Sequence, residues 1–127
     1  MLEIVEKTGT AGYEDIIAFA GRSDLHITES LDGNTVTGFI AYAYSPERTV
    51  VYGFSDGGDL MLCDGLVRSV MFKSVLKGID AMLFQLPEGN DLGSLEKLRF
   101  LKKGSTLCTD LNSYMNSCEH CKSAKDT

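Results

Sequence analysis

The chain has 127 residues, of which 43% are hydrophobic and 24% charged, a balance typical of one globular domain with its own core. Its formal net charge of −6 argues against a nucleic acid or an anionic membrane as the main partner, because both require a basic surface. The sequence contains no apolar run near the roughly 20 residues of a membrane span. Acids stand where a signal peptide has bases, so we expect a cytoplasmic protein.

The first part of the chain predicts a weak strand and then a helix. Leu2–Glu6 alternates weakly between apolar and polar residues, as in a half-exposed strand. Tyr13–Ala20 carries apolar residues at the spacing of one helix face, and Gly21 is typical of a helix end.

Three strands joined by two tight turns are expected next. The turn signal Asp32-Gly33-Asn34 links a short strand over Leu25–Leu31 to the β-branched and aromatic run Thr35–Tyr44. A second turn at Ser45-Pro46-Glu47-Arg48 leads to a strand over Thr49–Phe54. These segments predict an antiparallel meander.

The longest periodic segment is Leu60–Lys77, where apolar residues form two adjacent stripes of one helix. Asp59 can cap its start, and Gly78 can end it. The later segments predict a buried strand over Ile79–Leu86, a short helix over Leu92–Phe100 and a last strand over Thr106–Met115.

The predicted order is therefore β-α-β-β-β-α-β-α-β. A meander followed by a helix and a buried strand predicts an α+β fold with a mixed, mainly antiparallel sheet and helices on its faces. We expect one domain over residues 1–117 and a polar, cysteine-containing tail over residues 118–127.

Several short motifs accompany this order. Asn90 follows the fifth expected strand, and the segment Ser94-Leu95-Glu96-Lys97-Leu98-Arg99-Phe100 follows it. Tyr114-Met115 ends the last expected strand, and Asp64-Gly65-Leu66-Val67-Arg68 lies in the long helix before Lys77-Gly78-Ile79. Over roughly residues 25–116 the chain resembles divergent bacterial members of the GNAT superfamily of acyl-CoA N-acyltransferases. Members of this family carry an Asn and then Leu-Tyr-Glu-Lys-x-Gly-Phe at these places.

The resemblance implies transfer of an acyl group from acyl-CoA, as co-substrate, to a small-molecule or protein amine. It assigns the pantetheine arm to the backbone at Tyr52, Gly53 and Phe54. It assigns the pyrophosphate to the N–H groups of Gly57, Gly58 and Asp59 at the start of the long helix, and it adds Asn90 to the cofactor-binding residues.

The sequence departs from the family at two functional positions. No Arg or Gln opens the loop Ser55–Asp59, and Asp56 and Asp59 place negative charge where a pyrophosphate would lie. Without a basic residue after them, Gly57 and Gly58 are more typical of a strand-to-helix turn than of a phosphate site. These features favour the alternative of a catalytically degenerate binding or regulatory module.

Leu95 stands where the family has the tyrosine that protonates the departing thiolate, so the catalytic residues stay open. Tyr42, Tyr44 and Tyr52 lie on expected strands and could reach a central cleft, but the sequence does not choose among them.

The four cysteines are expected to be reduced thiols or metal ligands rather than disulfides. Cys118 and Cys121 have the spacing of half a zinc site, to which Cys108 or His120 could add a ligand, and a homodimer could pool two tails. The alternatives are a polar tail with exposed thiols or a redox pair. Cys63 is expected to be a small buried hydrophobe rather than a nucleophile paired with a histidine.

Overall fold

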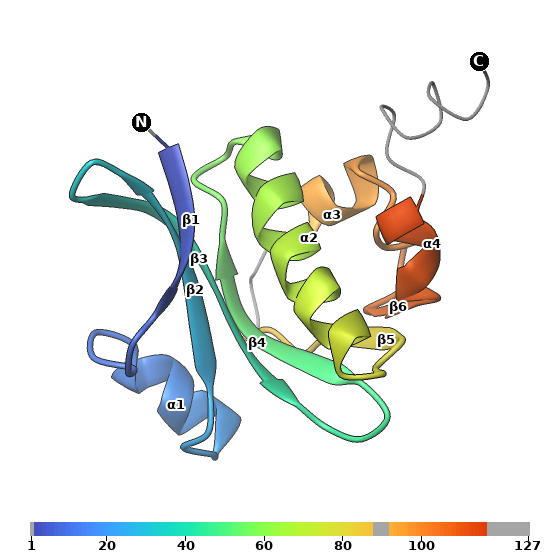
Figure 1. Ribbon diagram of the computed structural model, residues 1–127, viewed down its shortest axis with the longest axis horizontal. Coiled ribbons are helices and arrows are strands. Elements are labelled where there is room, and N and C mark those ends of the chain that lie inside the picture. The colour runs from blue at the N-terminus through green and yellow to red at the C-terminus, as the bar shows by residue number, and fades with distance from the viewer. Residues whose placement is uncertain (1, 88–91, 117–127) are drawn as a thin grey trace.

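The computed structural model describes residues 2–87 and 92–116 (Figure 1). The described elements, in chain order, are β1 (Leu2–Lys7), α1 (Glu14–Ala20), β2 (His26–Asp32), β3 (Thr35–Tyr44), β4 (Thr49–Ser55), α2 (Leu60–Leu76), β5 (Ala81–Phe84), α3 (Gly93–Lys97), β6 (Leu107–Thr109) and α4 (Leu111–Asn116). Up to β6 this is the predicted order. None of the described helices is both long and apolar enough to cross a membrane.

The strands form one sheet in the order β1-β2-β3-β4-β5-β6. Each neighbouring pair is antiparallel except β4 and β5, which are parallel and are connected through α2. A parallel pair needs such a crossover because the chain must return to the same end of the sheet. The predicted α+β fold with a mixed, mainly antiparallel sheet is thus confirmed.

The helices divide between the two faces of the sheet, with α2 across one face and α1 on the other (Figure 1). The main core lies under α2, whose inward side carries the two predicted stripes. Their residues are all buried: Leu62, Leu66 and Val70 in one, Cys63, Val67 and Met71 in the other. Ser74 is buried on the same side. A smaller core lies under α1, where Leu25, Ala43, Val50 and Tyr52 are packed by Ile16, Ile17 and Ala20. β4 therefore contributes side chains to both cores.

The prediction of a last strand over Thr106–Met115 is wrong beyond its first residues. Asp110 has a φ of 57°, in the left-handed region, which ends β6. The next N–H groups find acceptors on Asp80: Leu111 N donates to its carbonyl and Asn112 N to its carboxylate, both at 3.2 Å. The chain then turns into α4, so Tyr114-Met115 ends a helix and not a strand.

Candidate functional site

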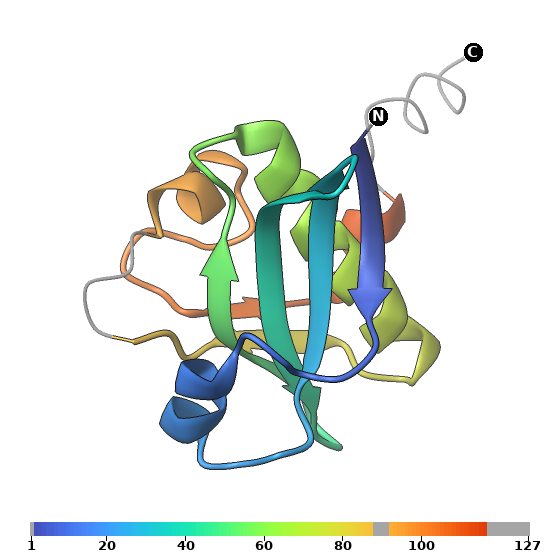
Figure 2. The ribbon, with the colours of Figure 1, turned by 90° about the vertical axis from the view of Figure 1, so that its left-hand side faces the viewer.

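The ladder between β4 and β5 is short. It pairs Thr49 with Met82, Val50 with Leu83 and Val51 with Phe84, and Gln85 N donates to Val51 O at 2.8 Å. β4 continues beyond this point to Ser55 while pairing only with β3. Figure 2 shows β4 turning away from β5, which runs across the direction of the meander. The backbone at Tyr52–Phe54 therefore has no ladder partner on the β5 side within the described residues.

A bulge in β4 lies where the two strands part. Ala41 pairs with Gly53 and Tyr42 with Val51, which leaves Tyr52 as an extra residue. A Cβ atom on Gly53 would lie 2.6 Å from Ile16 Cδ1, so the missing side chain lets α1 pack closely on β4. Tyr52 follows Val50 by two residues and shares the α1 face with it, beside the end of the ladder.

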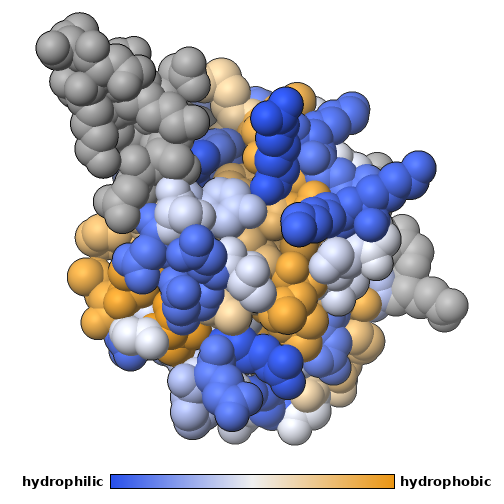
Figure 3. Space-filling model, turned by 90° about the vertical axis from the view of Figure 1, so that its right-hand side faces the viewer, coloured by the Kyte–Doolittle hydropathy of each residue, from blue (hydrophilic) through white to orange (hydrophobic). Residues whose placement is uncertain are grey.

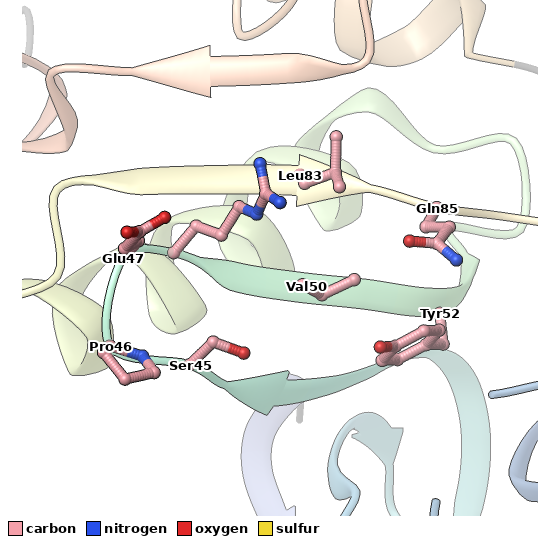
Figure 4. A pocket seen from close by; sticks show the side chains of 8 residues that line it. Ser45, Pro46, Glu47, Val50, Tyr52, Leu83 and Gln85 are labelled. Atoms are coloured by element: carbon pink, nitrogen blue, oxygen red, sulfur yellow. The ribbon is translucent and has the colours of Figure 1, made fainter. Parts of the chain in front are cut away.

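A pocket of about 430 Å³ opens on this face. It is lined by Ser45, Pro46, Glu47, Arg48, Val50, Tyr52, Leu83 and Gln85. Figure 4 shows Val50 and Leu83 between its two ends, with Tyr52 and Gln85 at one end and the β3–β4 turn at the other. The pocket thus has an apolar middle, a neutral polar end where the ladder stops and a charged end at the turn.

The charged end holds an unpaired cation. Within residues 2–87 and 92–116, no side chain pairs with the Arg48 guanidinium or the Glu47 carboxylate, and both residues are exposed. Near the neutral end, Arg22 holds Asp24 through two hydrogen bonds of 2.5 and 2.6 Å. The pKa of Arg22 is raised by Asp24 and also by its contact with the Tyr52 phenol. Arg48 is therefore the arginine of the pocket that is open to an anionic ligand.

The structure separates the three tyrosines that the sequence left equivalent. Tyr42 is fully buried on the α2 face, where its hydroxyl donates to Glu6 Oε1 and contacts Thr28 Oγ1, each at 3.1 Å. Burial raises its pKa. Tyr44 packs against His26, and Lys77 lies 4.8 Å from its ring centre. Tyr52 alone of the three lines the pocket.

Two smaller hollows of about 240 and 230 Å³ lie away from the end of the ladder. The first lies between the start of α2 and Leu98, and the second between β6 and α4. On the face that carries α4, apolar areas are broken up by polar side chains (Figure 3). The pocket beside Tyr52 is larger than either hollow and lies where the β4–β5 ladder ends, so it is the better candidate.

In the loop between β4 and α2, the backbone N–H groups donate to the carboxylates of the loop itself. Asp56 Oδ1 accepts from Gly58 N at 2.8 Å, and Asp59 Oδ1 accepts from Met61 N at 2.9 Å and Leu62 N at 3.4 Å. These N–H groups belong to the anion site that the family resemblance implies for a pyrophosphate. Like charges 4 Å apart cost about 1 kcal/mol in water and about 4 kcal/mol near a protein surface. As built, the loop does not fit a pyrophosphate group.

The charge of Asp56 is also poorly compensated. Among the described residues its Oδ2 atom is shielded from solvent and accepts no hydrogen bond of good geometry. The Cys63 thiol lies close by, and its pKa is raised to about 12 by burial first and then by this carboxylate. Cys63 is fully buried, as expected of a small hydrophobe, and is a poor nucleophile at neutral pH.

Leu95 is fully buried in the core under α2, so the position of the family tyrosine is a packing position in this chain. Asn90, Cys118, His120 and Cys121 lie outside the described residues. Cys108 is buried beside Tyr114. Among the described residues, no three His, Cys, Asp or Glu side chains gather as a metal site would require.

Neither protein-family models nor curated proteins match the sequence, whereas solved structures match the fold. The IAA acetyltransferase from Bacillus cereus ATCC 14579 has 12% identity and a TM-score of 0.60 over 80% of this chain and 79% of its own. The ribosomal-protein-S18-alanine N-acetyltransferase from Escherichia coli has 12% identity and a TM-score of 0.59 over 80% and 78%. A GNAT family acetyltransferase from Elizabethkingia anophelis, with acetyl-CoA bound, has 12% identity and a TM-score of 0.55 over 85% and 92%. This chain therefore has the fold of the GNAT-family acetyltransferases.

Proposed function

We propose that this chain is a divergent GNAT-type N-acyltransferase, which takes an acyl group from a thioester and passes it to an amine. The observation that carries the proposal is the position of the pocket. Tyr52 lies both at its neutral end and at the first residue of β4 beyond the ladder with β5. A donor along the free edge of β4 and an acceptor in the pocket would therefore meet beside Tyr52.

The unpaired backbone of Tyr52–Phe54 supports the donor side. An extended molecule can hydrogen-bond to such an edge as an added strand does. The thiol arm of an acyl-CoA has amide groups suited to this contact. The fold implies acyl-CoA as donor, but the carboxylates of Asp56 and Asp59 would repel its pyrophosphate. The donor would therefore be recognised through the thioester and its arm alone.

The chemistry needs positioning more than strong acids or bases. The amine nitrogen attacks the thioester carbonyl, a C–N bond forms, the C–S bond breaks, and the thiol leaves with the proton that the amine gives up. Holding both reactants at one point supplies much of the rate enhancement. The Tyr52 phenol lines the pocket at this point, which supports a role in hydrogen-bonding the reacting groups.

The opposite end of the pocket suits an acceptor that also carries an anion. Arg48 is unpaired within the described residues, and a guanidinium binds a carboxylate through two parallel hydrogen bonds. Val50 and Leu83 fit an apolar stretch between that carboxylate and the amine. We therefore expect amino-carboxylate compounds among the acceptors.

The test is release of free thiol from S-acetylpantetheine and from acetyl-CoA in the presence of a panel of amines with and without a carboxylate. Tyr52→Phe should lower kcat by about tenfold or more, as loss of a catalytic hydroxyl does. Arg48→Gln should raise KM for a carboxylate-bearing acceptor by about 10- to 100-fold, the value of a charged hydrogen bond.

The matched controls are Tyr44→Phe, on the neighbouring strand outside the pocket, and Arg99→Gln, an exposed arginine away from it. Both should leave thiol release unchanged. Amine-dependent release that is equally affected by control and pocket variants would contradict this site. Absence of release with every donor and amine would contradict the activity itself.

A binding module without catalysis is the second candidate. The filled loop and the buried Leu95 favour it, because both remove groups that the family uses in catalysis. In that case a carboxylate-bearing ligand binds wild type and fails to bind Arg48→Gln, while no thiol is released. Calorimetry with the same amines distinguishes the two functions.

A further inference from the structure

In the segment from Asp56 to Asp59, carboxylates of the chain itself accept the hydrogen bonds that an anion would accept. Two carboxylates each accept hydrogen bonds from the backbone N–H groups that a bound anion would use: Gly58 N for the first, Met61 N and Leu62 N for the second. Asp59 N, in addition, donates to Asp56 O at 3.0 Å. Four donors around the helix start are thus already satisfied from within the chain, namely the N–H groups of Gly58, Asp59, Met61 and Leu62.

The chain directly on either side of this loop carries no free basic residue to offset these acids. The sequence has no Lys or Arg between Arg48 and Arg68. Arg48 belongs to the pocket on the α1 face, and Arg68 is held by Asp64 at 2.9 Å and by Tyr114 O at 2.7 Å. A diphosphate at this loop would have to displace the carboxylates and then lie beside them.

The free edge of β4 carries no such obstruction. Within residues 2–87 and 92–116, Tyr52–Phe54 pairs with β3 on one side and has no strand partner on the other. The part of the site for a thiol arm is thus open, whereas the part for a diphosphate is closed.

We infer that this chain selects acyl thioesters whose thiol arm lacks a pyrophosphate, because Asp56 and Asp59 occupy the pyrophosphate site. The inference rests on the proposed acyltransferase function and names its donor class. The transfer is the one given above: the C–S bond of the thioester breaks, a C–N bond forms, and the free arm leaves as a thiol.

The experiment compares binding of S-acetylpantetheine, acetyl-CoA and inorganic pyrophosphate by calorimetry to wild type and to Asp56→Asn/Asp59→Ser. Asn can still accept from Gly58 N, and Ser still caps a helix, so the variant loses charge but keeps the turn. The control Glu3→Gln/Asp15→Asn removes the same charge from exposed residues of β1 and α1.

Wild type and control should bind S-acetylpantetheine at least as tightly as acetyl-CoA, and should not bind pyrophosphate. The loop variant should gain about tenfold or more in affinity for acetyl-CoA and bind pyrophosphate, with S-acetylpantetheine unchanged. Tighter binding of acetyl-CoA than of S-acetylpantetheine by wild type would overturn the inference.

The measurement with inorganic pyrophosphate distinguishes a failure of this inference from a failure of the proposed function. If wild type binds neither thioester, the acyltransferase proposal fails. Pyrophosphate binding that is gained by the loop variant alone would still support the inference that Asp56 and Asp59 prevent a pyrophosphate from binding at the loop. A folded loop variant that gains neither pyrophosphate nor acetyl-CoA overturns it. Circular dichroism checks folding, and the single variant Asp59→Ser provides the test if the double variant does not fold.

Discussion

A buried hydroxyl pair fixes the start of β4 and gives a sharp test of the packing beneath the site. Thr49 Oγ1 lies 2.6 Å from Ser74 Oγ, and both residues are fully buried. Ser74 Oγ also donates to Val70 O at 2.8 Å. The Ser74 proton is thus used within α2, and the Thr49 hydroxyl must be the donor to Ser74 Oγ.

The two single substitutions should therefore differ. Ser74→Ala leaves the buried Thr49 hydroxyl without its partner and should destabilise by about 1–3 kcal/mol. Thr49→Val leaves Ser74 bonded to Val70 O and should cost only about 0.5–1.5 kcal/mol. In the double variant no hydroxyl remains, so its cost should be about 0–1 kcal/mol, well below the sum of the singles.

Urea denaturation followed by circular dichroism measures these free energies of unfolding. With m of about 1–3 kcal/mol/M, a loss of 2 kcal/mol moves the midpoint by about 1 M. Ser69→Ala, on the outer side of α2, corrects for the helix propensity of the substitution and should stabilise slightly. Single-variant costs that add within about 0.5 kcal/mol would refute the reasoning.

Three further outcomes are expected. Burial raises the pKa of Glu6, but the hydrogen bonds from Lys73 and Tyr42 and the charge of Lys73 together outweigh it, so the pKa is lowered. The resulting stability is present above the ordinary pKa of 4.5 and is lost as the pH falls below it. Glu6→Gln should therefore reduce the decrease of the urea midpoint at acid pH, and an unchanged decrease would contradict this. Leu95→Tyr should destabilise by about 1–3 kcal/mol through overpacking without raising thiol release, and a gain in release would contradict its packing role. Iodoacetamide should leave Cys63 unmodified in the folded protein near pH 8 and label it in urea, as mass spectrometry can show, since burial keeps its pKa near 12; equal labelling in both states would contradict this.

The elements predicted well are those whose signals are local. Turn residues at Asp32-Gly33-Asn34 bound the strand Thr35–Tyr44, whose ends match β3 in the structure. The stripes of α2 and its cap at Asp59 depend on neighbours within one or two turns. In each case the residues that decide the structure lie within the element or directly beside it.

The elements predicted poorly depend on distant partners. Leu107 and Leu111 suggest one alternating strand, yet Leu107 is 41% exposed, whereas Leu111, the first residue of α4, is fully buried in the main core. The helix starts there because Asp80, about thirty positions earlier, accepts its first N–H groups. Nothing within the segment indicates that contact.

The candidate site was predictable in part. The conflict of Asp56 and Asp59 with a pyrophosphate is visible as charge in the sequence, and the structure adds that the carboxylates occupy the N–H groups. The choice of Tyr52 required the faces of the strands. It lies on the α1 side, whereas Tyr42 and Tyr44 pack on the α2 side, a difference set by pairing across the sheet.

The two halves of β4 explain how this fold can persist while its chemistry changes. Thr49 and Val51 are fully buried and paired on both sides, so substitutions there act on the core. From Tyr52 the chain leaves the β5 ladder, and from Ser55 to Gly58 it is mostly exposed, so the packing of the sheet depends less on those last residues. A charge such as Asp56 can therefore stand in this loop without loss of the sheet, and we expect it to affect which anion the start of α2 accepts. Pairing in the sheet thus depends on β4, whereas the charge beside the start of α2 belongs to the loop that follows, so removal of the Asp56 charge should alter anion binding more than unfolding.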